Sequence, residues 1–222
     1  MPAGSRHSTG PAPRAIARVR VALMGGTFDP PHVGHLLAAS DAFDQLLLDR
    51  LIFVPAATQP LKQHQASSPA NHRLRMVQLM VEGDTRFEVD EIEIKRMGLS
   101  FTVDTLEEYS RRFPDAERFL LLGVDAFGLL DQWRDAARVL NLAHLVVLTR
   151  AAEGVGAVDL ESVTNQVRAI GGSKAATPHV LNTRRIDVSS TEIRERVHAG
   201  RPIRGYVSDA VGQYIEFNGL YR

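Results

Sequence analysis

Apolar positions follow two different periods along this chain. Short runs of Val, Ile, Leu and Phe bounded by Gly or Pro are typical of buried strands, whereas apolar residues three and four apart are typical of helices that pack on one face. Strands are predicted at 20–24, 51–54, 119–122 and 145–148, with further extended segments at 87–94 and 180–188. Helices are predicted at 34–48, 71–81, 101–112, 189–198 and 208–217, and a short helical stretch is predicted around Trp133.

The order of these elements indicates the fold. Strands that alternate with helices are joined by right-handed crossovers, which produce a mainly parallel sheet covered by helices on both faces. We predict an α/β, Rossmann-like, doubly wound fold with a small helical part at the C-terminus, and a single domain over residues 19–222. Ligands of such sheets bind at the carboxyl ends of the strands, near the switch in strand order. Glycines and charged residues follow the predicted strands there, namely Gly25, Gly26, Gly123, Arg150 and Asp187.

Composition narrows the class of protein. Lys plus Arg and Asp plus Glu both count 26 among 222 residues, so the overall charge does not favour nucleic acid or lipid as a partner. The sequence has no cysteine, which excludes disulfides, thiolate nucleophiles and Cys-ligated zinc. No apolar run approaches the roughly 20 residues of a membrane helix. We expect a cytoplasmic protein that binds neither nucleic acid nor membranes.

The first 18 residues differ from the rest of the chain. They are rich in Ala, Pro, Ser, Gly and Arg, and the first acidic residue is Asp29. A transit peptide has a similar composition, but Pro2, Pro11 and Pro13 interrupt any helix. We predict a disordered, mildly basic extension over residues 1–18.

The segment 25–35, Gly-Gly-Thr-Phe-Asp-Pro-Pro-His-Val-Gly-His, is the most informative part of the sequence. It lies between a buried strand and a helix, where paired glycines let backbone N–H groups approach an anion and the helix N-terminus adds positive potential. It is neither a P-loop nor a Gly-x-Gly-x-x-Gly fingerprint. His32 and His35 instead share one face of the first helical turn, and Gly34 between them leaves room for a bulky ligand. Two imidazoles there can bind phosphate oxygens and stabilise charge on a pentavalent phosphorus.

Other interpretations of this histidine pair have to be weighed. A single histidine at a helix start is usually a cap or a surface residue, and a His-x-x-His pair can bind a metal. The sequence shows no evident third ligand, and zinc-binding pairs on helices more often lie four residues apart. The whole eleven-residue pattern after a strand therefore favours a phosphate site.

The segment 187–194, Asp-Val-Ser-Ser-Thr-Glu-Ile-Arg, starts a second helix. A Ser-x-x-Glu capping box begins at Ser189, which by itself indicates only a well-formed helix start. The alternative is a polyphosphate site, where the hydroxyls of Ser190 and Thr191, the free N–H groups and Arg194 one turn later converge. The segment alone does not distinguish these two interpretations. Together with the first segment it predicts two helix N-termini that hold opposite ends of a triphosphate.

Both segments resemble the signature motifs of the nucleotidyltransferase superfamily. From about Val19 to the C-terminus, further stretches are similar to bacterial nicotinate-mononucleotide adenylyltransferases. These stretches are Ser100-Phe101-Thr102 with Asp104-Thr105, Gly123-Val124-Asp125, Gln132-Trp133 and the terminal stretch 214–221. The resemblance implies that ATP and nicotinate mononucleotide give nicotinate adenine dinucleotide and pyrophosphate. It also implies Mg²⁺ that is bound through the phosphates and not by protein side chains.

Residue by residue, the resemblance implies three groups of site residues. His32, His35 and Arg194 are expected to be catalytic, with His35 nearest the reacting α-phosphate. The residues expected to bind ATP are Gly25, Gly26, Thr27, Phe28, Gly34, Gly123, Asp125, Ser189, Ser190 and Thr191. Those expected to bind the mononucleotide are Lys62, Phe101, Thr102, Trp133 and Arg150.

The mononucleotide group has specific implied contacts. Trp133 is expected to stack on the pyridine ring, Thr102 to meet the pyridine carboxylate through its backbone, and Arg150 to reach a phosphate. Without the resemblance, Trp133 would be interpreted as a packing residue and Arg150 as a solvated strand end.

The chain departs from the family pattern in three places. Leu61 replaces the His of a Pro-Pro-His-Lys stretch that keeps Lys62, Phe101 replaces a Tyr, and Arg150 is followed by Ala-Ala and not by Pro-Gly. These changes bear on the contribution of the 59–68 loop, a candidate lid, and not on the reaction.

Two other functions stay open at this point. Another adenylyl- or cytidylyltransferase, such as one that acts on phosphopantetheine, is usually shorter and would lack the Trp133 and Ser-Phe-Thr features. A catalytically idle nucleotide-binding module would be favoured by loss of a motif histidine or of Arg194, and this chain retains all of them.

Overall fold

The computed structural model describes residues 18–62, 67–149, 159–173, 175–184 and 186–222. The predicted extension 1–18 lies outside the described residues except for Arg18. Within the described residues, one sheet of six parallel strands has the order β3-β2-β1-β4-β5-β6. The strands are β1 Arg20–Gly26, β2 Arg50–Pro55, β3 Phe87–Val89, β4 Glu117–Gly123, β5 His144–Thr149 and β6 His179–Asn182. The predicted α/β, doubly wound fold is confirmed.

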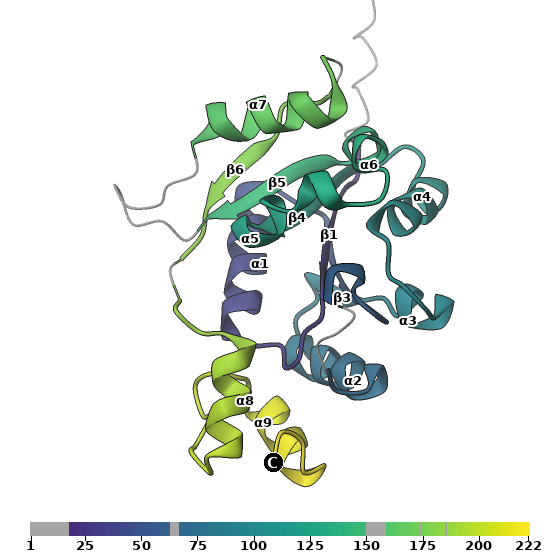
Figure 1. Ribbon diagram of the computed structural model, residues 1–222. Coiled ribbons are helices and arrows are strands. Elements are labelled where there is room, and N and C mark those ends of the chain that lie inside the picture. The colour runs from purple at the N-terminus through teal and green to yellow at the C-terminus, as the bar shows by residue number, and fades with distance from the viewer. Residues whose placement is uncertain (1–17, 63–66, 150–158, 174, 185) are drawn as a thin grey trace, which may run out of the picture.

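Helices cover both faces of the sheet, and a small helical part lies at the C-terminal end of the chain (Figure 1). The α-helices are α1 Val33–Gln45, α2 Ala70–Val81, α3 Ile92–Arg96, α4 Thr102–Arg112, α5 Val124–Phe127, α6 Ala136–Leu142, α7 Leu160–Gly171, α8 Ser190–His198 and α9 Asp209–Phe217. Two short 3₁₀ helices are η1 Pro60–Lys62 and η2 Leu130–Gln132. No helix in the described ranges combines the length and the apolar character that a membrane span requires.

Alternate residues of each strand face opposite layers of helices, as the pleat of a strand demands. Ala22 of β1 belongs to a core cluster with residues of α1, α2, α8 and α9, whereas its neighbours Val21 and Leu23 belong to a cluster with residues of α4, α5, α6 and α7. Both faces are therefore buried, which explains why the central strands read as continuous apolar runs.

The strand order shows where along the sheet the ligand crevice is expected. The chain runs from β1 outward through β2 to β3, returns to β4 beside β1, and then runs outward through β5 to β6. The switch in direction lies between β1 and β4, whose carboxyl ends are Gly26 and Gly123. Ligands of this fold bind at that point.

Three sequence predictions are corrected by the structure, and one helix was missed. The helical stretch expected to contain Trp133 is η2, which ends at Gln132, and Trp133 itself has an extended backbone. The segment 87–94 is a strand only to Val89, since the side chain of Asp90 accepts a hydrogen bond from the N–H of Ile92 (2.9 Å) and starts a turn into α3. Its expected position near the sheet edge is confirmed. The segment 180–188 stays in the sheet only to Asn182. Helix α7 was not predicted, although Asp159 caps its N-terminus and its apolar residues have helical spacing.

Candidate active site

The loop between β1 and α1 is fixed by the ring of Phe28. This residue is buried and has φ +53°, a left-handed conformation that is uncommon for a bulky side chain and is often found at functional sites. A Cβ atom on Gly26 would lie 2.9 Å from Cζ of Phe28, so the ring occupies the space that the glycine leaves open. The ring also meets His35 edge to face, with centroids 5.1 Å apart. Gly26 and Phe28 together set the path of the loop.

The two motif histidines lie side by side at the start of α1. Their ring centroids are 3.8 Å apart, as their spacing on one helical face predicts. His35 Nδ1 accepts a hydrogen bond from the backbone N–H of His32 at 3.2 Å. In the neutral imidazole the proton is then on Nε2, which makes that atom a donor. His32 is buried and His35 is half-buried.

The prediction that Gly34 leaves room for a ligand is wrong. A Cβ atom at this position would lie 3.0 Å from Nδ1 and 3.1 Å from Cε1 of His32. The open space is filled by the imidazole of His32, which packs against the first turn of α1. Gly34 is therefore needed to accommodate His32, and its expected part in binding ATP stays a prediction.

The second motif contacts the first directly. Ser189 caps α8, because its Oγ accepts from the N–H of Glu192 at 3.1 Å. Ser190 Oγ donates to the carbonyl oxygen of Pro30 at 2.8 Å, and Arg194 Nη1 donates to that of Asp29 at 2.7 Å. These contacts join residues that are 160 and 165 positions apart in the chain. The start of α8 is thereby fixed against the loop that leads into α1.

The side chain of Asp29 is held inside the protein. Its Oδ1 accepts from the hydroxyl of Tyr221 at 2.6 Å, and its Oδ2 accepts from the N–H of Ser68 at 3.0 Å. Burial and the bond to Asp29 raise the pKa of Tyr221, so the phenol remains a donor at neutral pH. The first motif is thus tied to the C-terminal segment and to the end of the 59–68 loop.

A buried arginine joins the same loops through their backbones. Arg73 of α2 is 1% exposed and donates to the carbonyl oxygens of Thr27 (2.8 Å), Ala57 (2.9 Å) and Ser68 (2.9 Å). Burial lowers the pKa of Arg73, and the nearby Asp29 carboxylate opposes this effect. One guanidinium therefore fixes the loop 25–32 between β1 and α1, called the phosphate loop below, relative to the segment that follows β2.

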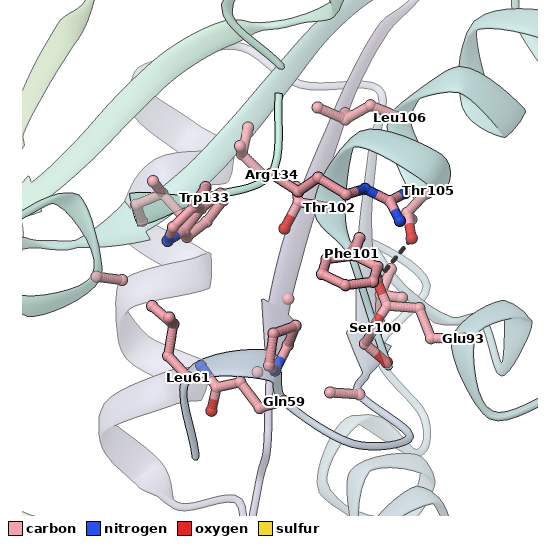
Figure 2. Close-up of a pocket in the computed structure, with 18 of the residues that line it drawn as sticks. Gln59, Leu61, Glu93, Ser100, Phe101, Thr102, Thr105, Leu106, Trp133 and Arg134 are labelled. Carbon is pink, nitrogen blue, oxygen red and sulfur yellow. Dashed lines mark hydrogen bonds between the residues drawn. The ribbon is translucent and has the colours of Figure 1, made fainter. Parts of the chain in front are cut away.

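A pocket opens at the carboxyl ends of β1, β2 and β4, beside α4 (Figure 2). Phe101, Thr102 and Trp133 line it, and so do Gly25 and Gly26 of the phosphate loop. Figure 2 shows Trp133 and Phe101 on two sides of the pocket, with Thr102 between them. Three of the five predicted mononucleotide residues thus share one cavity with the two glycines of the predicted ATP loop.

Comparison with known proteins agrees with this geometry. A family model described as cytidylyltransferase-like matches residues 23–196, which include both motifs. A Gemmatimonas aurantiaca protein named "Probable nicotinate-nucleotide adenylyltransferase" is 52% identical over 208 residues, which cover 92% of this chain and 93% of that protein. The chain belongs to the nicotinate-nucleotide adenylyltransferase family. A Thermus thermophilus protein of the same name is 42% identical over 204 residues, which cover 92% of this chain and all of that protein (100%).

Solved structures agree on the fold of this adenylyltransferase. Plasmodium falciparum nicotinic acid mononucleotide adenylyltransferase complexed with NaAD has a TM-score of 0.74 at 17% identity, and the match covers 92% of this chain and 98% of that one. At this low identity the likeness bears on the fold alone.

Several predicted residues of the adenylyltransferase take no part in the contacts described so far. Gly123 and Asp125 are exposed at the carboxyl end of β4, where α5 begins, so they border the switch point. Arg150 lies outside the described residues, as do residues 63–66 of the candidate lid. Lys62 has its backbone in η1. The roles assigned to all of these residues stay predictions.

Four residues beside the site were not predicted from the sequence. Arg73 and Tyr221 form the buried contacts below the phosphate loop, and Glu93 and Arg134 line the pocket. Arg73 had a visible signal, since a charged residue at helical spacing with buried Met76 falls on the apolar face of α2. Glu93 and Arg134 had no such signal, because their positions follow from how α3 and the segment after η2 meet the pocket.

Adenylyl transfer from ATP generally uses a divalent metal ion. Within the described ranges, no three His, Asp or Glu side chains are grouped so that they could hold a metal ion. Asp29, the acid of the first motif, has both carboxylate oxygens occupied by Tyr221 and Ser68. A divalent ion carried by the phosphates of ATP fits this arrangement, because it requires no protein carboxylate.

Proposed function

We propose that this adenylyltransferase transfers the adenylyl group of ATP to nicotinate mononucleotide, giving nicotinate adenine dinucleotide and pyrophosphate. The observation that carries the proposal is that Gly25 and Gly26 belong both to the phosphate loop and to the wall of the Trp133 pocket. A mononucleotide bound in that pocket would extend its phosphate toward the loop that binds ATP. Since ATP is a cytoplasmic substrate, the proposal also places the enzyme in the cytoplasm.

The reaction requires no protein nucleophile. An oxygen of the mononucleotide phosphate, already anionic at neutral pH, attacks the α-phosphorus of ATP, and the bond from that phosphorus to the pyrophosphate oxygen breaks in line. No covalent enzyme intermediate forms, and no general base is needed. Alignment of the two phosphates and stabilisation of the developing charge then account for catalysis.

The residues of the two motifs would supply that stabilisation. His35 would donate from Nε2 to the α-phosphate, in the tautomer that its bond to the His32 N–H favours. His32 would fix the orientation of His35 and contact the neighbouring phosphates. Ser190 and Arg194 would hold the triphosphate from the start of α8, where unpaired N–H groups and the helix dipole also favour anions.

Magnesium ion would be bound by the phosphates of ATP. It would neutralise the charge on the leaving pyrophosphate. His32, His35 and Arg194 would bind the phosphate oxygens directly. Ser190, whose hydroxyl donates to Pro30, would contribute its backbone N–H.

The pocket suits a pyridine carboxylate. Phe101 and Trp133 offer aromatic faces to the ring, and Thr102 is the first residue of α4. The first N–H groups of a helix have no partner within the helix and carry positive potential, which suits a carboxylate. The carboxamide of nicotinamide mononucleotide lacks the negative charge, so we expect the acid to be preferred.

Pyrophosphate release tests the proposal. With ATP and Mg²⁺, we expect strong turnover with nicotinate mononucleotide, weaker turnover with nicotinamide mononucleotide and none with phosphopantetheine. Omission of Mg²⁺ in the presence of EDTA should abolish turnover, because the triphosphate then keeps its full charge. A lack of pyrophosphate release with both pyridine mononucleotides would contradict the proposed substrate. Turnover with phosphopantetheine would contradict it as well.

Replacing Trp133 with alanine tests the ring contact. Stacking of a base on an aromatic side chain contributes about 1–3 kcal/mol, so the KM for nicotinate mononucleotide should rise by about fivefold to 150-fold. The KM for ATP should change little, because Trp133 lines the pyridine end of the cavity. Steady-state kinetics with each substrate varied in turn measures both values.

Trp133→Phe is the matched variant, since it keeps an aromatic face and should recover most of the affinity. Similar increases of the KM for ATP and for the mononucleotide would mean that Trp133 is a packing residue and not part of the pyridine site.

A further inference from the structure

Glu93 is a buried carboxylate beside the pocket that the proposed reaction does not use. It is 7% exposed and lies on α3, and it lines the pocket together with Ser100 and Thr105 (Figure 2). We propose that Glu93 is a positioning residue of the mononucleotide site, which holds the Ser100–Thr102 segment in the place where the pyridine ring binds. This inference rests on the proposed function.

Two hydroxyl groups meet the carboxylate. Thr105 Oγ1, in the first turns of α4, donates to Glu93 Oε1 at 2.6 Å, and the hydroxyl of Ser100 lies close enough to lower the pKa of Glu93. Ser100 and Thr105 flank Phe101 and Thr102, the residues expected to meet the pyridine ring and its carboxylate. The carboxylate therefore fixes both ends of the segment that forms this wall of the pocket.

Both hydroxyls already accept a hydrogen bond from elsewhere. Ser100 Oγ accepts from the N–H of Ala57 at 2.8 Å, and Thr105 Oγ1 accepts from Arg96 Nη2 at 3.0 Å. The proton of Thr105 is directed at Glu93, and that of Ser100 can point the same way. An ionised carboxylate can accept both, whereas a protonated acid or an amide turns one of its two terminal atoms into a donor. The hydroxyls therefore favour the ionised form of Glu93 and oppose the effect of its burial on the pKa.

The same network reaches the ATP loop. Ala57 belongs to the segment after β2, and two residues later Gln59 accepts a hydrogen bond from Thr27 Oγ1 at 2.9 Å. This contact is indirect, whereas the contact with the pyridine wall is immediate through Ser100. Loss of the Glu93 charge should therefore affect the mononucleotide much more than ATP.

Charged groups around Glu93 act in opposite directions. Burial raises the pKa of Glu93, and Asp104 adds to this effect, while the two hydroxyl bonds and Arg96 oppose it. Arg134 lines the same pocket and pairs with Asp104.

Because the pKa of Glu93 is higher in the folded protein than in the unfolded chain, its contribution to stability is most favourable at low pH. That contribution declines as pH rises from the unfolded value, about 4.3, through the raised folded value. At neutral pH the ionisation of Glu93 therefore does not raise the free energy of unfolding.

Glu93→Gln tests the inference, since it keeps the shape of the side chain and removes the charge. We expect the KM for nicotinate mononucleotide to rise about threefold to tenfold, with the KM for ATP nearly unchanged and the melting temperature equal or higher. In the wild-type enzyme the same KM should rise as pH falls toward the pKa of Glu93, and the Gln variant should lose that dependence. A role in folding alone predicts the reverse pattern, a lower melting temperature with an unchanged KM.

Two further variants make the test specific. Thr105→Val should reproduce the effect and add little to it in the Glu93→Gln background, because both changes act on the same contact. Tyr109→Phe removes another hydroxyl–carboxylate bond of α4, that to Asp90 (2.7 Å), away from the pocket, and should leave both KM values unchanged.

The results separate this inference from the proposed function. An unchanged KM for the mononucleotide, equal increases of both KM values, or a lower KM in the Gln variant would each overturn it. A wild-type enzyme that shows no turnover with nicotinate mononucleotide would overturn the proposed function and this inference together. Normal wild-type turnover with an unaffected Gln variant would overturn the inference alone.

Discussion

Replacement of His35 by alanine is expected to lower kcat by about 10²- to 10³-fold, the usual cost of losing one donor to a developing charge. His35 has its Nδ1 occupied by the N–H of His32 and therefore acts as a donor through Nε2. Its side chain is only half-buried, so the alanine variant should still fold. Single-turnover measurement of adenylyl transfer at saturating ATP and mononucleotide reports the chemical step directly.

Two variants control for indirect effects. His35→Gln offers an amide N–H near the position of Nε2 and should recover part of the lost rate, whereas an alanine cannot. His198→Ala removes an exposed histidine at the end of α8 and should leave kcat unchanged. Near-normal kcat in His35→Ala, with intact circular dichroism, would rule out a catalytic role for this residue.

Arg73→Met is expected to lower the free energy of unfolding by about 3–5 kcal/mol. The variant leaves three partly buried carbonyl oxygens, those of Thr27, Ala57 and Ser68, without their donors. Partial burial places each loss in the lower half of the usual range of about 1–3 kcal/mol, which gives the expected sum. This loss is a large share of the stability of about 5–15 kcal/mol that an ordinary domain has. Urea unfolding followed by circular dichroism measures the difference.

The matched control lies on the same helix. Arg75→Met changes an exposed arginine of α2 and should alter stability by no more than about 0.5 kcal/mol. Arg73→Lys should be nearly as damaging as the Met change, because a lysine ammonium cannot reproduce the planar fork that reaches three carbonyls. Equal stability of the Arg73 and Arg75 variants would show that the buried hydrogen bonds contribute little.

Much of the fold could be predicted because the main signals are local. The apolar runs that become β1, β2, β4 and β5 are buried on both faces and carry their period in the sequence itself. The histidine pair and the Ser189 cap were likewise predictable, since both depend on spacing within one helical turn.

What escaped prediction depends on contacts between distant segments. The alternation of Phe87 to Ile94 fits a strand, yet the turn at Asp90 ends it and carries Glu93 into the pocket wall. Gly34 looked like space for a ligand until the imidazole of His32 was seen to fill that space. Spacing along the chain does not show which neighbour will occupy an open position.

The bond between Asp29 and Tyr221 has a consequence for how the enzyme is made. The two residues are 192 positions apart, so at about 5–20 residues per second a ribosome adds Tyr221 roughly 10–40 s after Asp29. Throughout that interval the nascent chain holds the phosphate loop without its hydroxyl partner, while β1 and α1 are already synthesised. The support of the phosphate loop by Tyr221 is therefore added long after the loop itself has been synthesised.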